Sequence, residues 1–279
     1  MSDAFVPWDQ RVGELDLAPG STLLVASDVT RMAYLASERR VRFDPAKFLD
    51  ALLAALGPSG TLLVPTFHWD FLDHKPFDMR KSIPRTGALA KAALRHPAFA
   101  RTWHPIHSFA VAGQHKDLVA GLRNRSSFGP DSPFAFLRRE AGKMLLLDVD
   151  FQHSFTYVHH VEEREHAWYR RAARYTAAYT SEAGETRTET FLMHTLRPGF
   201  YTRVNPLGEH LQRIGLAHAR SMGDIHGTLV ELAPAYEEIR RDLWHNGGRL
   251  IHVFDPQRLL TERLVPAVMR RVRRRSQQA

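Results

Sequence analysis

The sequence contains no cysteine among its 279 residues. Disulfide bonds, thiolate nucleophiles and zinc or iron–sulfur sites built on cysteine are therefore excluded. The longest apolar runs, residues 21–26 and 61–64, are far shorter than the roughly 20 residues that a membrane-spanning helix needs. The opening residues 1–9 have neither the basic start nor the apolar segment of a signal peptide. We therefore expect a cytoplasmic protein with no membrane partner.

Several catalytic signatures are also missing from the sequence. It has no Gly-x-Ser-x-Gly elbow of a serine hydrolase and no glycine-rich phosphate loop. A metal site must still be weighed, because metal-ligating side chains cluster at His153, His159, His160, Glu162 and His166. However, the His-Glu-x-x-His spacing of zinc peptidases is absent. A general base with its neighbours explains the cluster better, and we expect no metal.

Positive charge is present in moderate excess, with 38 Lys and Arg against 30 Asp and Glu and a formal net charge of +8. The segment 269–275 alone carries five arginines, so the rest of the chain is only mildly basic. No recognisable nucleic-acid motif accompanies this tail. We expect a basic helix or tail over residues 256–279 and no nucleic-acid partner.

The first part of the chain reads as a strand, a helix and a second strand. Residues 23–26 and 60–66 are apolar runs typical of buried strands. Between them, Asp44 is placed to cap a helix that has Pro45 at its first position and ends before Gly57. Strand, helix and strand form the repeating unit of a parallel sheet. We therefore predict an α/β fold, a mainly parallel central sheet flanked by helices, in a single domain over residues 1–279.

The remaining elements are predicted from periodicity and turn residues. A β-hairpin over 175–193 is expected to turn around residues 182–185 and to form an insertion in the domain. Residues 67–85 show no clear periodicity and are predicted as a long loop. Further strands are expected at 109–113, 144–147 and 249–254, and further helices at 86–94, 160–169, 206–214, 229–244 and 256–274.

The most informative stretch is residues 154–162, which follows the predicted strand 144–147. Within it, His159 has a carboxylate three residues on, at Glu162. A histidine with a carboxylate neighbour at the mouth of a parallel sheet is typical of a general base. A second polar cluster, residues 101–108, contains His104, His107 and Ser108 ahead of another predicted strand. A structural role in shaping the loop remains open for these histidines.

Six segments together resemble the aminoglycoside 3-N-acetyltransferase family, which differs in fold from the GNAT acetyltransferases. In chain order they are residues 23–27, 56–66, 84–87, 101–108, 128–133 and 156–162. The remainder matches only loosely, around residues 222–227. The resemblance implies transfer of an acetyl group from acetyl-CoA to an amine by direct attack, without a covalent acyl-enzyme.

The resemblance also implies roles for individual residues. The family motif of Thr, His and Glu at intervals of three falls on Thr156, His159 and Glu162, so we assign His159 as general base and Glu162 as its partner. Whether Glu162 or another acid supports the ring is left open. The residues assigned to donor binding are Ser27, Thr66, His104, Ser108, Arg39 and Arg40. Those assigned to substrate binding are Thr156, His160 and Asp70. Thr66 could equally be a turn residue.

The first-strand motif departs from the family pattern. The family usually has His-Ser-Ser, whereas this chain has Ala26, Ser27 and Asp28, and the glycine pair that follows is replaced by residues 37–42. Arginines in that segment could bind the donor phosphates instead. An alternative is a non-catalytic or altered-donor member of the fold that binds a ligand or a partner.

The acceptor is expected to be a small-molecule amine. Aminoglycosides are polycations that need acidic pockets, and like charge at a binding site weakens affinity. Because this chain is basic, we favour an amino sugar or a biosynthetic intermediate over an antibiotic as acceptor. The oligomeric state is left open between a monomer and a homodimer.

Overall fold

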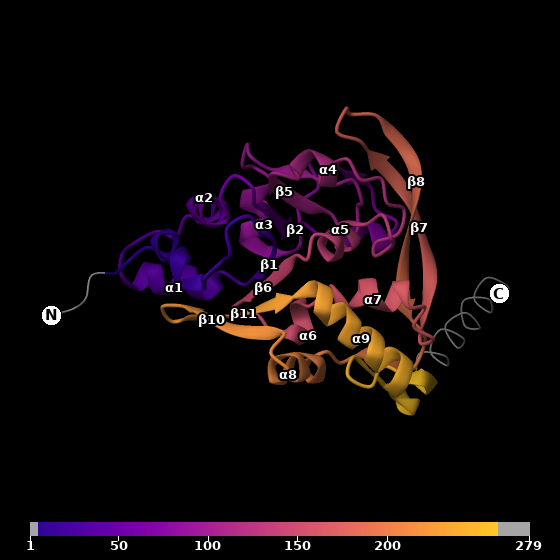
Figure 1. Cartoon of the computed structure of the whole chain (residues 1–279). Helices are drawn as coiled ribbons and strands as arrows, with labels where there is room; N and C mark the ends of the chain where they lie inside the picture. The colour runs from indigo at the N-terminus through magenta and orange to yellow at the C-terminus, as the bar shows by residue number, and fades with distance from the viewer. Residues whose placement is uncertain (1–4, 262–279) are drawn as a thin grey trace.

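The computed structural model describes residues 5–261, and a mixed sheet forms the centre of this part of the chain (Figure 1). The sheet has seven strands in the described residues, in the order β10-β11-β6-β1-β2-β5-β4. They are β1 (Thr22–Ser27), β2 (Thr61–Pro65), β4 (Ala100–Arg101), β5 (Phe109–Gly113), β6 (Lys143–Leu147), β10 (Ala217–Met222) and β11 (Ile225–Glu231).

Strand direction confirms the predicted fold class. The strand β1 lies at the centre and pairs in parallel with both β2 and β6. The strands β5 and β11 run antiparallel to their neighbours, and β4 and β10 reverse direction again. Five of the seven strands of the described sheet therefore point the same way, although parallel pairs occur only at the centre.

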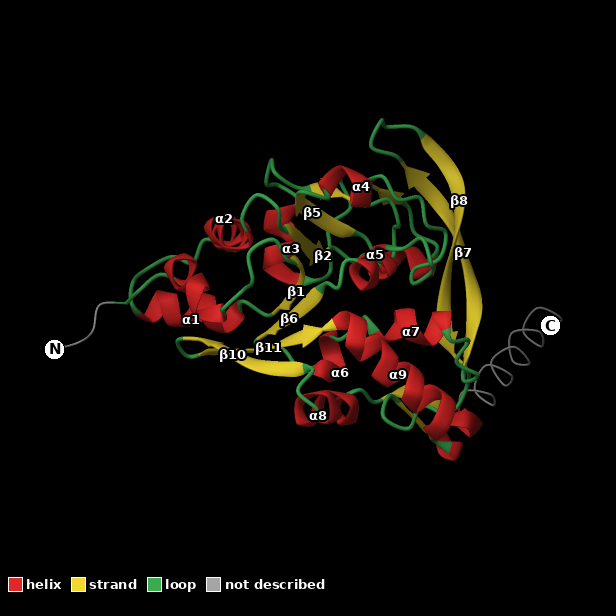
Figure 2. Cartoon of the chain, in the orientation of Figure 1, coloured by secondary structure: helices red, strands yellow, loops and turns green. Residues whose placement is uncertain are grey.

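Helices cover both faces of this sheet (Figure 2). Alternate side chains of β1 enter opposite cores, as the pleat requires: Leu23 and Val25 face one core, and Leu24 and Ala26 face the other. The first core is closed by η1 (Trp8–Leu15), α1 (Thr30–Glu38), α2 (Pro45–Leu56) and α3 (Gly87–Ala93). The second is closed by α5 (Pro133–Arg139), α7 (Val158–Arg164), α8 (Asn205–Arg213) and α9 (Leu232–Asn246).

The helix α2 shows how local sequence fixes an element. The Asp44 carboxylate accepts hydrogen bonds from the backbone N–H groups of Ala46 and Lys47. Pro45 occupies the first turn, and Gly57 ends the helix at a positive φ of 69°. These caps satisfy backbone groups that have no partner inside the helix. The prediction for this helix is confirmed.

The predicted hairpin is confirmed and is longer than expected. It consists of β7 (Arg170–Thr180) and β8 (Thr186–Leu196), which extend along one side of the central body (Figure 1). The short β3 (Phe77–Asp78) pairs in parallel with β7. A separate apolar cluster that includes Phe71, Phe77 and Phe191 attaches the hairpin to the body.

Several predicted boundaries differ from the structure. The helix expected at 160–169 ends at Arg164, because Arg170 already pairs with Leu196 as the first residue of β7. Residues 229–231 belong to β11 rather than to a helix, because they pair with β6. The expected loop 67–85 contains η2 (Trp69–Asp73) and β3. The helices η1, α1 and α5 and the strands β10 and β11 were not predicted.

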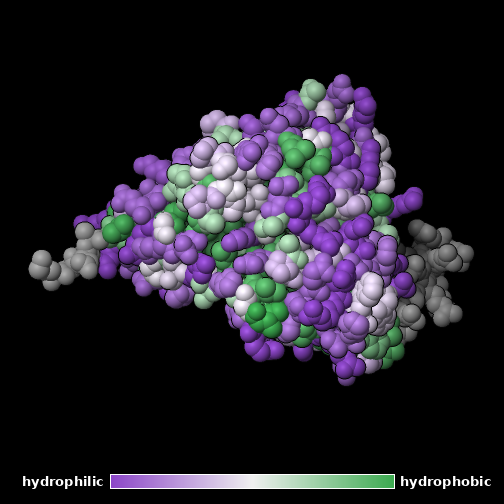
Figure 3. Space-filling model, in the orientation of Figure 1, coloured by the Kyte–Doolittle hydropathy of each residue, from purple (hydrophilic) through white to green (hydrophobic). Residues whose placement is uncertain are grey.

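The remaining elements are short. They are α4 (Lys116–Ala120), α6 (Phe151–Ser154), β9 (Phe200–Thr202) and β12 (His252–Phe254). Residues 256–261 are helical, and the rest of the predicted basic tail lies outside the described residues, so the single domain over 1–279 stays a prediction. Within 5–261, no helix is both long and apolar enough to cross a membrane. The face shown in Figure 3 is mostly hydrophilic, with apolar side chains in separated patches.

Candidate active site

A histidine and a glutamate lie on one face of α7. The Nδ1 atom of His159 is 2.6 Å from Oε2 of Glu162. This contact follows from their spacing, because residues three apart are neighbours on a helix surface. The Glu162 side chain is 1% exposed, whereas that of His159 is 23% exposed. The carboxylate is therefore buried behind a ring that still reaches solvent.

Two further side chains hold the Glu162 carboxylate. The Nε atom of Arg170, on β7, forms an ion pair with Oε2 at 2.6 Å. The Tyr169 hydroxyl donates a hydrogen bond to Oε1 at 2.7 Å. Burial by itself raises the pKa of Glu162, but the positive charge of Arg170 and the contacts with His159 outweigh it and lower the pKa to about 2. The carboxylate is therefore ionised at neutral pH.

The protonation of His159 follows from these neighbours. Burial and the charge of Arg170 lower its pKa below 6.5, and Glu162 opposes them. Nδ1 lies 2.6 Å from the Glu162 carboxylate and 2.9 Å from Nη2 of Arg170, which carries only donors. These two contacts favour opposite tautomers, because an ionised carboxylate can only accept a hydrogen bond. We place the proton on Nδ1, donating to Glu162, because that contact is the shorter of the two. The ring is then neutral at pH 7, with a free lone pair on Nε2.

A cavity of about 750 Å³ lies at the carboxyl ends of the central strands. Its wall includes the end of β1 from Val25 to Ser27, the end of β2 at Val64 and Pro65, and the N-terminus of α1. Ligands of open α/β sheets commonly bind at this edge. Thr156 also lines the cavity and lies one turn before His159. Neither His159 nor Glu162 lines the cavity, but the backbone N–H of His159 donates to the Thr156 carbonyl at 3.1 Å, so the pair lies next to this part of the wall.

The structure places Ser27 and its neighbour Asp28 in the wall of this cavity. Asp28 accepts a hydrogen bond from the backbone N–H of Thr30 at 2.8 Å, where α1 begins. This carboxylate occupies a helix N-terminus, a position that otherwise suits an anion of a ligand. The departure from the family motif noted above therefore changes the charge of the cavity wall.

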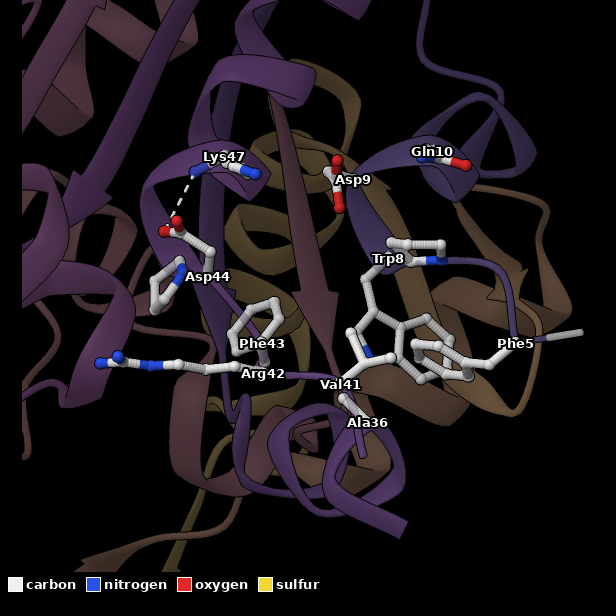
Figure 4. A pocket seen from close by; sticks show the side chains of 12 residues that line it. Phe5, Trp8, Asp9, Gln10, Ala36, Val41, Arg42, Phe43, Asp44 and Lys47 are labelled. Carbon is white, nitrogen blue, oxygen red and sulfur yellow. Dashed lines mark hydrogen bonds between the residues drawn. The ribbon is translucent and has the colours of Figure 1, made fainter. Parts of the chain in front are cut away.

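Two smaller cavities adjoin the large one. One, of about 520 Å³, is lined by aromatic side chains that include Trp8 and Phe43, together with Lys47 (Figure 4). The other, of about 530 Å³, includes Arg40. Arg42 and Phe43 line all three cavities and so mark their junction. Arg39 is exposed and is not among the lining residues of these three cavities.

Thr66 and Ser108, both assigned to donor binding, are fully buried. The Thr66 and Ser108 hydroxyl oxygens are 2.9 Å apart, and Ser108 also lies 2.8 Å from the Thr66 carbonyl oxygen. The Arg101 guanidinium donates to Ser108 Oγ at 3.1 Å and to the Thr66 carbonyl at 3.1 Å. These contacts join the end of β2 to the start of β5. The structure gives both hydroxyls protein partners and does not place them in the wall of the large cavity.

The structure does not place three other assigned residues in the wall of the large cavity. His104 is fully buried. His160 is 1% exposed, and its Nδ1 atom is 2.7 Å from the Phe128 carbonyl oxygen, on a different face of α7 from His159. Asp70 forms an ion pair with Arg85 at 2.7 Å. Among residues 5–261, no group of three ligating side chains is arranged to hold a metal ion.

Arg170, Tyr169 and Phe128 also belong to the site, although no local sequence pattern predicted them there. Arg170 and Tyr169 reach Glu162 only because the chain turns back into β7 directly after α7. The Phe128 ring packs against His159, with 5.4 Å between ring centroids. Phe128 is the first residue of segment 128–133, which carries part of the family resemblance. This position was the only indication in the sequence that Phe128 could belong to the site.

Comparison with known proteins agrees with the predicted family. A family model for aminoglycoside 3-N-acetyltransferase matches residues 32–243. The chain is 36% identical over 138 residues to aminoglycoside N(3)-acetyltransferase IV of Salmonella sp, and the match covers 48% of this chain and 49% of that protein. It therefore spans about half the length of that relative.

Solved structures share the fold. The crystal structure of aminoglycoside acetyltransferase AAC(3)-Xa has a TM-score of 0.72 and 25% identity, and the match covers 87% of this chain and 93% of that one. The binary complex of AAC-IIIb with CoASH has a TM-score of 0.67 and 20% identity, covering 82% and 92%. Because the family model matches most of the sequence, the chain belongs to the aminoglycoside 3-N-acetyltransferase family.

Proposed function

We propose that the protein transfers an acetyl group from acetyl-CoA to an amine of a small molecule, with His159 as general base. The observation that carries this proposal is the contact between His159 Nδ1 and the buried, ionised Glu162, next to a cavity of about 750 Å³. The family membership and the CoASH complex of a structural neighbour support acetyl-CoA as donor.

In the proposed reaction the acceptor nitrogen attacks the thioester carbonyl carbon directly. His159 Nε2 takes the proton that the nitrogen loses as the C–N bond forms. Glu162 holds the ring in the required tautomer and stabilises the imidazolium. When the C–S bond breaks, the sulfur leaves with the electron pair and receives the proton from His159. The amide and free CoA are produced, and the enzyme returns to its starting state.

The proposed acceptor is an amine on a neutral or anionic molecule, such as an amino sugar. Acidic side chains around α7 already have partners: Glu163 lies 3.2 Å from Nδ1 of His194, and Glu165 accepts from aromatic side chains of α9. Asp70 is paired with Arg85. A polycation would have to compete for these carboxylates. An aminoglycoside is the second candidate, because the relatives in the family carry that name.

The test begins with calorimetric titration of the purified protein with acetyl-CoA and with CoA. CoA release is then followed with two panels of amines, one of aminoglycosides and one of neutral and anionic amino sugars. Micromolar binding together with CoA release is expected. Binding without turnover on either panel would favour the non-catalytic alternative, and absence of binding would favour an altered donor.

The variant His159→Ala tests the base. We expect kcat to fall by about 10²–10⁴-fold with little change in CoA binding, because general base catalysis is lost while the cavity wall is retained. The matched control is His218→Ala, which removes a partly exposed imidazole on β10 that is paired with Glu231 and does not line any of the three cavities. An active His159→Ala variant would show that the base has been wrongly assigned.

A further inference from the structure

A second histidine lies between the cavity and the base. The His107 ring is 5% exposed and packs between two phenylalanine rings, with centroid distances of 4.7 Å to Phe67 and 4.6 Å to Phe128. Phe67 lines the large cavity, and Phe128 contacts the His159 ring. His107 does not itself line the large cavity, but its ring lies directly behind Phe67 of the cavity wall and, through Phe128, next to the proposed base.

A chain of hydrogen bonds begins at the neighbouring His104. The backbone N–H of His107 donates to Nδ1 of His104, at 3.3 Å. Burial lowers the pKa of His104 to about 3, so its ring is neutral at physiological pH. A neutral imidazole carries one proton, and Nδ1 is acting as an acceptor. The proton of His104 is therefore on Nε2.

Ser127 links the protonated nitrogen of His104 to the proton position on His107. Within residues 5–261, its buried hydroxyl has two hydrogen-bond partners, Nδ1 of His107 at 2.9 Å and Nε2 of His104 at 3.5 Å. A buried hydroxyl normally donates its proton, and because Nε2 of His104 is already protonated, Nδ1 of His107 is the acceptor within its reach. Burial and the nearby His104 and His159 lower the pKa of His107 well below 6.5, so this ring is also neutral. Its proton must then be on Nε2.

The Nε2–H group of His107 has no protein acceptor. It makes no hydrogen bond to the part of the chain that the structure describes. It is also not among the fully buried polar atoms without a partner in that part of the chain, so it keeps some solvent-accessible surface although the residue is only 5% exposed. A fixed, neutral N–H donor with no partner is unusual for a buried ring, because buried polar groups are normally satisfied within the protein.

We propose that Nε2–H of His107 donates a hydrogen bond to the thioester oxygen during acetyl transfer. The proposal rests on the proposed function and adds a catalytic residue to it. As the C–N bond forms, the π electrons of the C=O bond move to oxygen, and the N–H group stabilises that negative charge. When the C=O bond re-forms, the C–S bond breaks and the thiolate leaves. His107 keeps its proton throughout, and His159 alone transfers one.

The decisive variant is His107→Phe, which keeps an aromatic ring and removes the donor. Loss of one preorganised oxyanion donor lowers kcat by about 10²–10³-fold. We expect that loss with little change in the KM for acetyl-CoA and no shift of the acidic limb of the pH profile, which belongs to His159. The variant His107→Gln, which restores an N–H donor, should recover part of kcat.

The matched control is His115→Phe. This ring packs against Phe136 at 5.4 Å and contacts Thr61 Oγ1 at 3.2 Å, at the other end of the paired strands β2 and β5. The control should keep wild-type kcat. Equal kcat for His107→Phe and wild type would overturn the proposal, as would an equal loss in the control. If the wild type transfers no acetyl group to either panel, the proposed function itself fails and the catalytic role of His107 fails with it.

A measurement without turnover tests the hydrogen-bond chain separately. In ¹⁵N-histidine NMR spectra at pH 7, His107 should appear as the neutral Nε2–H tautomer. The variant Ser127→Ala should mix the two tautomers and lower kcat in the same direction as His107→Phe. An Nδ1–H tautomer or a charged ring in the wild type would overturn the proposal, whatever the activity.

Discussion

His159 lies between two side chains of opposite charge, which modify the effect of burial on its pKa. Burial lowers the pKa of His159, Arg170 lowers it further, and Glu162 raises it. Since a general base must be neutral to act, the pH at which activity appears should follow the charges of these two neighbours. Glu162, which is buried and ionised, also forms an ion pair with Arg170.

Substituting the two neighbours should shift the acidic limb of the pH–kcat profile in opposite directions. Glu162→Gln removes the charge that favours the imidazolium, so the limb should move to lower pH while the plateau falls by about 10²–10⁴-fold. Arg170→Met removes the charge that disfavours the imidazolium, so its limb should move to higher pH. Shifts in the same direction would contradict this account of the base.

Both variants leave one buried charge without its partner, which destabilises a fold by about 3–5 kcal/mol. The profiles should therefore be recorded at a temperature at which circular dichroism shows each variant folded. His159→Ala measured under the same conditions gives the level of residual transfer without the base.

Arg42, at the junction of the three cavities, is expected to bind the phosphates of the donor. Asp28 places a negative charge at the N-terminus of α1, so a phosphate needs a positive side chain elsewhere in the wall. Arg42→Ala should raise the KM for acetyl-CoA by about 10-fold. It should leave the KM for S-acetyl-N-acetylcysteamine, which has no phosphates, unchanged.

Arg39→Ala is the matched control for this prediction, because Arg39 lies in the same segment but is not among the lining residues of these cavities. Steady-state kinetics with both donors compares the two variants. A larger effect at Arg39 than at Arg42 would support the initial assignment of Arg39 and Arg40 and contradict the one made from the cavities.

At the scale of elements, the cavity depends on the register of β2 between β1 and β5. Thr61 pairs with Gly113 at the end of β5, where Gly113 has a positive φ of 97°. A Cβ atom at Gly113 would collide with the carbonyl oxygen of Gly60. The close approach of these two strand ends therefore requires glycine at this position.

Gly113→Ala should lower the free energy of unfolding by roughly 3 kcal/mol, through backbone strain and the collision. The control is Gly247→Ala, at the end of α9. Gly247 also has a positive φ, of 67°, but it has open space for a Cβ atom, so its cost should be about 1 kcal/mol. Urea unfolding measures both variants. Equal costs would show that strain alone, and not the strand contact, requires the glycine.

At the scale of the whole molecule, buried titratable groups link the site to the stability of the fold. His104 and His107 are held neutral by burial, and Glu162 is held ionised by Arg170 and His159. The folded pKa is lower than the unfolded one in each case. Unfolded chains therefore bind more protons as the pH falls, and acid favours unfolding.

The free energy of unfolding should decrease in two windows as the pH falls. The first begins near pH 6.5, where the histidines of the unfolded chain take up protons. The second lies between pH 4.5 and about 2, where the Glu162 contribution of about 3 kcal/mol is lost. Urea midpoints measured across this range test the prediction. The double variant His104→Phe/His107→Phe should reduce the loss in the first window, to which the buried His160 also contributes. The variant His96→Asn, at a half-buried histidine paired with Asp50, should leave it unchanged.

The sequence by itself determined the elements that depend on neighbouring residues. The strands β1, β2 and β6 were predicted from short apolar runs, and α2 from Asp44, Pro45 and Gly57, because caps and side-chain periodicity act over only a few residues. The spacing of His159 and Glu162 predicted a base with a carboxylate neighbour, but the contact itself was left open, because the helix was predicted to begin only at residue 160.

Only the tertiary structure decided which distant segments meet. The pairing of β11 with β6, the ion pair of Arg170 with Glu162 and the burial of Ser108 and His160 all join residues or surfaces brought together by folding. No local pattern encodes such contacts, because burial and pairing depend on how whole elements pack. For the same reason, the position of His107 between cavity and base became visible only in the fold.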